Sequence, residues 1–200
     1  MRMKTPDEIR KHLIACGSAA EACCDVFTDG ACVPNPGAGG WSFIIRFAGC
    51  PDIELFGGAG ETTNNRMEMT AVLQAMRAIP QGVTATIHSD SRYVIDGITG
   101  WMFTWQKGGW RKKPNPRSSS TEIMNLDLWQ QIYDERRRKS VKFVWVKGHA
   151  GHAQNERADE LAEMGRLAFL AGEIEPVEIP AAVLPDLNSE RQTRMYMGNR

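Results

Sequence analysis

Phe27-Thr28-Asp29-Gly30 is the stretch around which the chain is organised. Aromatic and β-branched residues favour strands, so residues 23–28 are predicted to form a strand and Asp29 to stand at its exit. Asp-Gly is also an ordinary turn pair. From this stretch alone, Asp29 is either a turn residue or a carboxylate that contacts a ligand. Residues elsewhere in the chain are needed to distinguish these two roles.

Outward from this stretch, the remaining pattern is typical of an α/β fold. Residues 33–40 are predicted to be a Gly/Pro-rich loop. Short links between the first three strands predict an antiparallel meander, and the helix before the fourth strand predicts a crossover with parallel pairing. The expected fold is a five-stranded mixed sheet, three antiparallel strands plus two parallel, flanked by helices. The further strands are predicted over residues 41–47, 53–58, 83–88 and 141–146, and the helices over 62–79, 92–99 and 101–106 (broken near Gly100), 126–138 and 155–170.

Two hundred residues suggest one domain with extensions. We expect an N-terminal extension over 1–22, a folded domain over 23–170 and a C-terminal tail over 171–200. In the extension, Pro6-Asp7-Glu8 predicts the start of a short helix. We expect this helix to be loosely docked or frayed, with a partner-binding helix as the alternative. Its apolar face is predicted to carry Ile9, Leu13 and Ile14.

The whole-chain charge is zero, with 24 acidic and 24 basic residues, so it predicts no partner. The basic residues nevertheless cluster in two places, which points to a face for a polyanion. The first cluster, in a stretch without acids, is Lys107, Arg111, Lys112, Lys113 and Arg117. The second is Arg136, Arg137, Arg138, Lys139 and Lys142, but cations at a helix C-terminus suit the helix dipole, so we interpret 136–139 as structural.

Five cysteines without a CxxC pair or zinc spacing are typical of a reduced cytosolic protein. The longest apolar run near the N-terminus, residues 13–16, is too short for a signal peptide. No run reaches transmembrane length. We therefore expect a cytoplasmic protein without membrane attachment, and a monomer.

Four carboxylates stand at the ends of separate predicted elements. Asp29 and Asp90 follow the first and fourth strands, whose carboxyl ends would lie side by side in a parallel pair. Glu68 and Asp159 lie in the first turns of two helices, where an acid also simply favours the helix dipole. A converging set of acids repels itself unless cations fill it, and oxygen ligands select Mg²⁺ or Mn²⁺. Paired ions of this kind cleave phosphodiesters.

With these residues in view, the chain strongly resembles type 1 ribonuclease H, especially the bacterial single-domain enzymes. The resemblance covers about residues 23–168 in the family's order, and its motifs together are very specific. The matching stretches are Phe27-Thr28-Asp29-Gly30-Ala31-Cys32, Asn35-Pro36-Gly37, Thr62-Thr63-Asn64-Asn65-Arg66-Met67-Glu68, Ser89-Asp90-Ser91, Trp145-Val146-Lys147-Gly148-His149-Ala150-Gly151-His152 and Asn155-Glu156-Arg157-Ala158-Asp159-Glu160-Leu161-Ala162.

The resemblance implies an endoribonuclease that hydrolyses the RNA strand of RNA–DNA hybrids with two Mg²⁺ ions, for which Mn²⁺ would substitute. The implied products carry a 3′-hydroxyl and a 5′-phosphate. The implied metal ligands are Asp29, Glu68, Asp90 and Asp159. His149 is implied to assist proton transfer or product release, and its flanking glycines and the general acid–base chemistry of an imidazole suit that task. Glu156 resembles a residue that helps to place the second ion or its water, and His152 is interpreted as helix-start structure.

The resemblance also implies contacts with both strands of the hybrid. Groove contacts would read the 2′-hydroxyls of the RNA, a pocket would hold a DNA phosphate, and a basic handle over residues 101–121 would bind phosphates without reading sequence. The implied substrate-binding residues are Cys32, Asn35, Thr63, Asn64, Asn65, Arg92, Trp101, Lys107, Arg111, Lys112, Lys113 and Asn155. Local packing is the alternative for Trp101, which lies one helical turn from Trp105.

Two features depart from the bacterial pattern: Arg92 stands where relatives often have Gln, and the handle contains Gly108-Gly109 and a longer loop over 114–121. Two alternatives to the implied function remain. Another nuclease or integrase of the same fold would share the carboxylates without the Asn and Thr groove residues. A hybrid-binding module would have lost a carboxylate, and none is missing. Tail-mediated protein interactions are compatible with any of these, and their partners are unknown.

Overall fold

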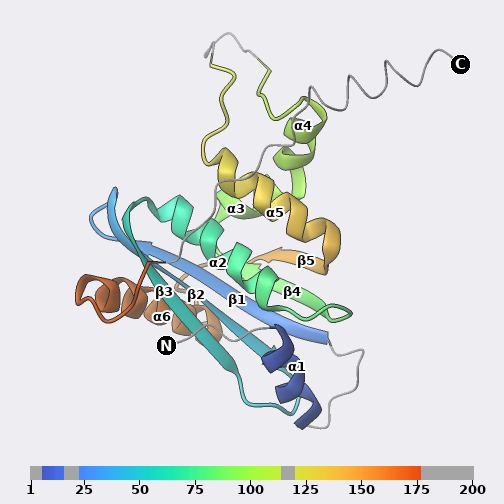
Figure 1. The fold of residues 1–200 in the computed structure, drawn as a ribbon, viewed down its shortest axis with the longest axis vertical. Coiled ribbons are helices and arrows are strands. Elements are labelled where there is room, and N and C mark those ends of the chain that lie inside the picture. The colour runs from blue at the N-terminus through green and yellow to red at the C-terminus, as the bar shows by residue number, and fades with distance from the viewer. Residues whose placement is uncertain (1–5, 16–22, 114–119, 177–200) are drawn as a thin grey trace, which may run out of the picture.

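The computed structural model describes residues 6–15, 23–113 and 120–176. A five-stranded sheet in the spatial order β3-β2-β1-β4-β5 forms the centre (Figure 1). β1 pairs antiparallel with β2, as β2 does with β3, while β1–β4 and β4–β5 pair parallel. This arrangement confirms the predicted α/β class and mixed sheet. The strands are β1 (Cys23–Cys32), β2 (Gly37–Phe47), β3 (Ile53–Thr62), β4 (Thr84–Ser89) and β5 (Ser140–Trp145).

Helices cover both faces of the sheet unequally. α2 packs on β1 and β2 and is joined there by α5, whereas among the described helices only α6 lies on the other face, against β1, β2 and β3 (Figure 1). Within the described residues, no helix is long and apolar enough to cross a membrane. The helices are α1 (Pro6–Ala15), α2 (Asn64–Ala78), α3 (Arg92–Asp96), the π-helical turn η1 (Gly97–Trp101), α4 (Met102–Lys107), α5 (Leu126–Arg138) and α6 (Ala153–Leu170).

The main core lies between the sheet and the α2–α5 layer. Apolar residues at helical spacing on α2 are fully buried there with Val26 of β1, Ile87 of β4 and Trp129 of α5. A smaller cluster under α6 joins Ile44 to Ala158 and Leu161. The helix starts that carry functional groups are therefore fixed by burial on both sides of the sheet.

The prediction that Asp29 ends a strand in a turn is wrong. β1 continues to Cys32, and Asp29 and Gly30 pair with Ser42 and Trp41 of β2. Gly30 serves close packing rather than a turn, because a β-carbon there would lie 2.2 Å from the backbone nitrogen of Glu68. Parallel pairing with β4 ends at Phe27, so Asp29 still projects beyond that part of the sheet.

The glycine-rich stretch predicted as a loop over residues 33–40 is also partly strand. β2 begins at Gly37, and β3 continues through its own glycines to Thr62. A β-carbon on Gly40 would stand 2.0 Å from the carbonyl oxygen of Ala162, so this glycine lets α6 approach the sheet. Glycine lowers strand propensity. Here the close packing of α2 and α6 on the sheet, which glycines permit, outweighs that preference.

The predicted helix break at Gly100 does not occur. α3, η1 and α4 follow one another without interruption, and the widened turn of η1 contains Gly100. The glycine with a packing role is Gly97, where a β-carbon would collide with the Trp129 ring. The chain therefore passes through this region as a helix with a π-type bulge.

The predicted short N-terminal helix is present as α1. Ile9 is completely buried in the main core, while Ile14 is exposed. Arg10 donates to the carbonyl oxygen of Gln81. Several predicted features lie outside the described residues. These are the side chain of Leu13, the cysteine at position 16, Arg117, most of the 114–121 loop and residues 177–200.

Candidate active site

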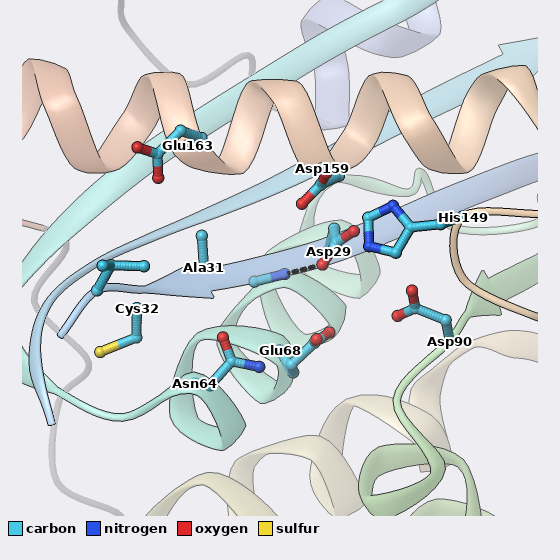
Figure 2. A pocket seen from close by; sticks show the side chains of 11 residues that line it. Asp29, Ala31, Cys32, Asn64, Glu68, Asp90, His149, Asp159 and Glu163 are labelled. Carbon is cyan, nitrogen blue, oxygen red and sulfur yellow. Dashed lines mark hydrogen bonds between the residues drawn. The ribbon is translucent and has the colours of Figure 1, made fainter. Parts of the chain in front are cut away.

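The four predicted carboxylates and His149 are among the residues that line one cavity of about 480 Å³ (Figure 2). Asp29 comes from β1, Glu68 from the first turns of α2, Asp90 from the end of β4 and Asp159 from α6. Carboxylate oxygens of Asp29, Glu68 and Asp90 lie within 4.8 Å of one another. Asp159 lines the same cavity from the α6 side. The structure thus brings the predicted acids together from four separate elements.

Local hydrogen bonds orient these acids. The backbone N–H of Gly30 donates to Asp29 Oδ1 at 2.7 Å. Asp90 is held from two other elements: Asn155 Nδ2 donates to its Oδ2 at 3.3 Å, and Trp145 Nε1 donates to its carbonyl oxygen at 2.9 Å. Glu68 is carried by the helix that Thr63 caps, where the threonine hydroxyl accepts from Arg66 N.

Burial makes this cluster electrostatically costly. The pKa of Asp29 is raised from 3.8 to about 8, chiefly by burial and then by the charge of Asp90. The pKa of Glu68 is raised well above its usual value by burial and then by Asp29. Glu68 Oε2 is buried without a hydrogen-bond partner among the described residues. At neutral pH the cluster needs protons or cations, and an all-oxygen set suits a hard divalent cation.

His149 lines the cavity from the loop between β5 and α6, and Figure 2 shows its ring pointing inward. Its φ of 49° lies in the left-handed region, which is uncommon for a non-glycine residue. Gly148 packs so closely on Asp90 that a β-carbon would stand 2.4 Å from Asp90 Oδ2. Glu156 accepts from Gly151 N at 3.1 Å and holds the same loop, while His152 occupies the N-cap position of α6.

Comparisons with known proteins agree with this geometry. The family model described as RNase H matches residues 21–166. The ribonuclease H of Mesorhizobium japonicum is 48% identical over 155 residues, which are 76% of this chain and 82% of that protein. The crystal structure of LC9-RNase H1, a type 1 RNase H with the type 2 active-site motif, is 29% identical with a TM-score of 0.64, covering 84% of this chain and 90% of that one.

A further structure, LC11-RNase H1 in complex with RNA/DNA hybrid, shares the fold at 21% identity and a TM-score of 0.52, covering 74% of this chain and 99% of that one. The chain belongs to the ribonuclease H family. The predicted family is thereby confirmed. The stretch matched to the ribonuclease H family begins before β1 and ends within α6, so it contains all four carboxylates and His149 and leaves α1 outside.

The ribonuclease H resemblance placed five substrate contacts around the loop after β1 and the start of α2. Cys32 and Asn64 line the cavity, and Asn35 Oδ1 accepts from Asn64 N at 3.2 Å, which ties that loop to α2. Thr63 is the N-cap of α2, and Asn65 is exposed beside it. The Cys32 thiol is buried and donates to backbone carbonyls, so its side chain has a structural contact of its own.

Arg92 and Trp101 lie outside the residues that line the cavity. The guanidinium of Arg92 stacks 3.6 Å from the centroid of Trp145, the residue that anchors the Asp90 backbone. Trp101 is partly exposed and packs on Tyr93 and Trp105. The local packing given as the alternative for Trp101 is therefore present. Part of the ring is also exposed and accessible to a substrate.

The basic handle residues are not among the residues that line the cavity. Lys107 ends α4, and Arg111 and Lys113 are exposed in the segment that follows. Lys112 is half-buried, and its backbone N–H donates to the Thr121 carbonyl. In the second cluster, Arg136 stacks on Phe103 and donates to the Ile98 carbonyl.

Sequence reasoning missed Glu163, which also lines the cavity from α6 (Figure 2). A usable signal was present, because Glu163 follows Asp159 by four residues and so lies on the same helix face. It also missed that Asn155, expected to bind substrate, donates to Asp90. The spacing of the sequence does not predict that contact, since the two residues are 65 positions apart.

Proposed function

We propose that the protein is an endoribonuclease that hydrolyses the RNA strand of RNA–DNA hybrids and leaves 3′-hydroxyl and 5′-phosphate ends. Membership of the ribonuclease H family supports the activity. The observation that carries the chemistry is the cluster of Asp29, Glu68 and Asp90, whose oxygens lie within 4.8 Å of one another.

This donor set fits divalent metal ions, with Mg²⁺ as the proposed cofactor and Mn²⁺ as a substitute. The buried Glu68 Oε2, which has no hydrogen-bond partner in the described part of the chain, has a lone pair available for a cation, and a cation would relieve the mutual repulsion of the acids. Asp29, Glu68, Asp90 and Asp159 would hold two ions. Bound there, they would supply activation of a water molecule and stabilisation of the leaving oxygen.

The protein's own groups prepare the site for that chemistry. Asn155 and Trp145 fix Asp90 by hydrogen bonds from two elements. Asp29 is fixed by its place in a paired strand and by Gly30 N. His149, on a loop with glycines beside it, is proposed to assist proton transfer or product release.

Substrate binding is proposed to use two regions. Asn35, Asn64 and the backbone near Cys32 would meet the minor groove, where RNA displays 2′-hydroxyls, and Thr63 and Asn65 would hold a DNA phosphate. Lys107, Arg111, Lys112 and Lys113 would add sequence-independent attraction for phosphates. Arg92 and Trp101 are proposed as further substrate contacts. We propose that the protein acts as a cytoplasmic monomer.

The decisive experiment compares a labelled RNA–DNA hybrid with matched RNA–RNA and DNA–DNA duplexes, each with Mg²⁺ and with excess EDTA. We expect cleavage of the RNA strand of the hybrid alone, and only with the metal. Cleavage of all three duplexes would indicate a general nuclease, and cleavage in EDTA would refute the metal assignment.

A further inference from the structure

Arg166 of α6 joins the wall of the cavity to the loop between β1 and β2. Its Nε and Nη2 donate to the two carboxylate oxygens of Glu163 at 2.7 and 2.5 Å. Its Nη1 donates to the carbonyl oxygen of Val33 at 3.1 Å. The guanidinium therefore binds a side chain that lines the cavity and the backbone of the loop at the same time.

The loop held in this way, residues 33–36, crosses from one wall of the cavity to the other. At its far end Asn35 Oδ1 accepts from the first backbone N–H of α2, at Asn64. The Cys32 thiol donates to the Pro34 carbonyl and folds the loop back on β1. The loop is thus attached to α6 through Arg166 and to α2 through Asn35.

The attachment to α6 is geometrically firm. The Arg166 side chain is only 13% exposed, and a β-carbon on Gly40 would lie 2.5 Å from the Arg166 backbone nitrogen, so α6 rests directly on β2 at this point. A planar guanidinium can make the paired carboxylate contact and a third bond together, which a lysine ammonium cannot match. The Glu163 side chain is 42% exposed, so solvent partly screens the charge of the pair, and the attachment depends on the geometry of its hydrogen bonds.

We propose that Arg166, braced by Glu163, is a positioning residue that sets the place of the 33–36 loop for binding the RNA strand. The inference rests on the proposed function. When the loop is already fixed, Asn35 can meet the groove of a hybrid without a further loss of loop entropy. A loop released at Val33 would have to be ordered when substrate binds, which would cost binding free energy. Loss of the contact should therefore weaken substrate binding and leave the carboxylate chemistry intact.

Another arginine on the same helix provides a matched control. Arg157 makes a bidentate contact with Glu54 of β3 and an i,i+3 pair with Glu160. It has the same donor type and a comparable number of bonds as Arg166. Arg157 is not among the residues that line the cavity, and its contacts do not involve the 33–36 loop.

The test measures KM and kcat for hybrid cleavage by the full chain, its Arg166→Ala and Arg166→Lys variants, and Arg157→Ala, with thermal melts to show that each is folded. For both Arg166 variants we expect KM to rise about three- to tenfold, as for loss of one hydrogen bond, with kcat within about twofold of wild type. Arg157→Ala should leave KM unchanged. Arg166→Lys carries the test alone if the alanine variant does not fold.

A double variant, Glu163→Gln with Arg166→Ala, separates loop position from charge. It removes both charges, so a KM that stays raised supports the loop, whereas a return to the wild-type KM would mean that bare Glu163 merely repels the substrate and would overturn the proposal. An unchanged KM in the Arg166 variants, or an equal rise in Arg157→Ala, would overturn it too. A wild type that leaves the hybrid uncut would instead refute the proposed function.

Discussion

Asp29 and Glu68 are carboxylates held in surroundings that oppose their charge. Burial raises the pKa of both, and neighbouring acids raise them further. Asp29 has an ordinary pKa of 3.8 and a folded pKa of about 8, so over that interval the folded state binds a proton that the unfolded state lacks. Its contribution to stability is present at low pH and is lost as the pH rises towards 8.

The metal-free protein should therefore melt at progressively lower temperature as the pH is raised from about 4 to 8, because Asp29 ionises near its ordinary pKa of 3.8 in the unfolded chain but only near a pKa of about 8 in the folded one. Thermal melts in EDTA would show this slope. Asp29→Asn, which cannot ionise, should flatten it. Addition of Mg²⁺ at pH 8 should raise the melting temperature of the wild type, and a flat wild-type profile in EDTA would contradict the assigned electrostatics.

Asp29→Asn should also separate binding from cleavage. The amide keeps the shape of the side chain and loses the charge that would hold a cation, so we expect kcat to fall more than about 100-fold while affinity for the hybrid stays near wild type. Single-turnover cleavage and fluorescence anisotropy measure the two quantities. Substantial residual cleavage would remove Asp29 from the metal site.

The types of the site residues could be predicted, but their supports could not. An acid after a strand or near the start of a helix is visible in the sequence, as Asp90 and Asp159 are. The stacking of Arg92 on Trp145 joins residues that are distant in the chain and depends on the register of β4 with β5. Such contacts arise from tertiary packing, which local patterns do not encode.

Among the elements, the strands are set by what packs on them. The α5 bounds were predicted to the residue, because its apolar periodicity is strong and its burial follows it. The ends of β1, β2 and β3 were predicted too short, since their glycines resemble turn residues and in fact admit α2 and α6. Glycine marks both a turn and a close approach, and the sequence alone does not distinguish them.

Gly30→Ala should destabilise the protein by about 1–3 kcal/mol or more, because the new β-carbon would collide with the backbone of α2 and would have to push that helix away. Gly60→Ala is the matched control, since its β-carbon would meet only the Phe169 ring at 3.7 and 4.0 Å. Urea unfolding of both variants measures the difference. Equal stabilities would show that α2 is not fixed by this contact.

The basic segment after α4 makes a different prediction. If Lys107, Arg111 and Lys113 contact phosphates, alanine at each should lower the slope of log Kd against log salt by about 0.9 per lost contact. Hybrid binding measured over a range of salt concentrations gives that slope. Arg138, exposed at the end of α5, is the control, and an identical change for Arg138→Ala would show that only net charge matters.

At the scale of the whole molecule, the folded unit reaches further towards the N-terminus than the family match. The match begins at residue 21, yet Ile9 of α1 belongs to the main core. The sequence indicated a short helix there, but one amphipathic face does not reveal whether a core has room for it. Because Ile9 is completely buried, we expect α1 to contribute to stability.

Ile9→Ala should cost about 2–4 kcal/mol, which corresponds to a fall of about 5–15 °C in melting temperature for a chain of this size. Ile14→Ala, on the exposed side of α1, should change stability by less than about 0.5 kcal/mol. Calorimetry on the full chain measures both. Equal melting temperatures would mean that α1 does not hold its place in solution.

β1 continues beyond its last parallel pair with β4. The face of the sheet on which Asp29 lies is therefore set by the alternation of side chains along β1. Gly30 faces α2, so its neighbours Asp29 and Ala31 face the opposite side of the sheet. A slip of one residue between β1 and β2 would turn Asp29 towards α2 and send Val26 out of the core. A chain with this slipped register would thus lose a buried core residue and the carboxylate of the site together, so correct pairing of β1 with β2 serves stability and the site at once.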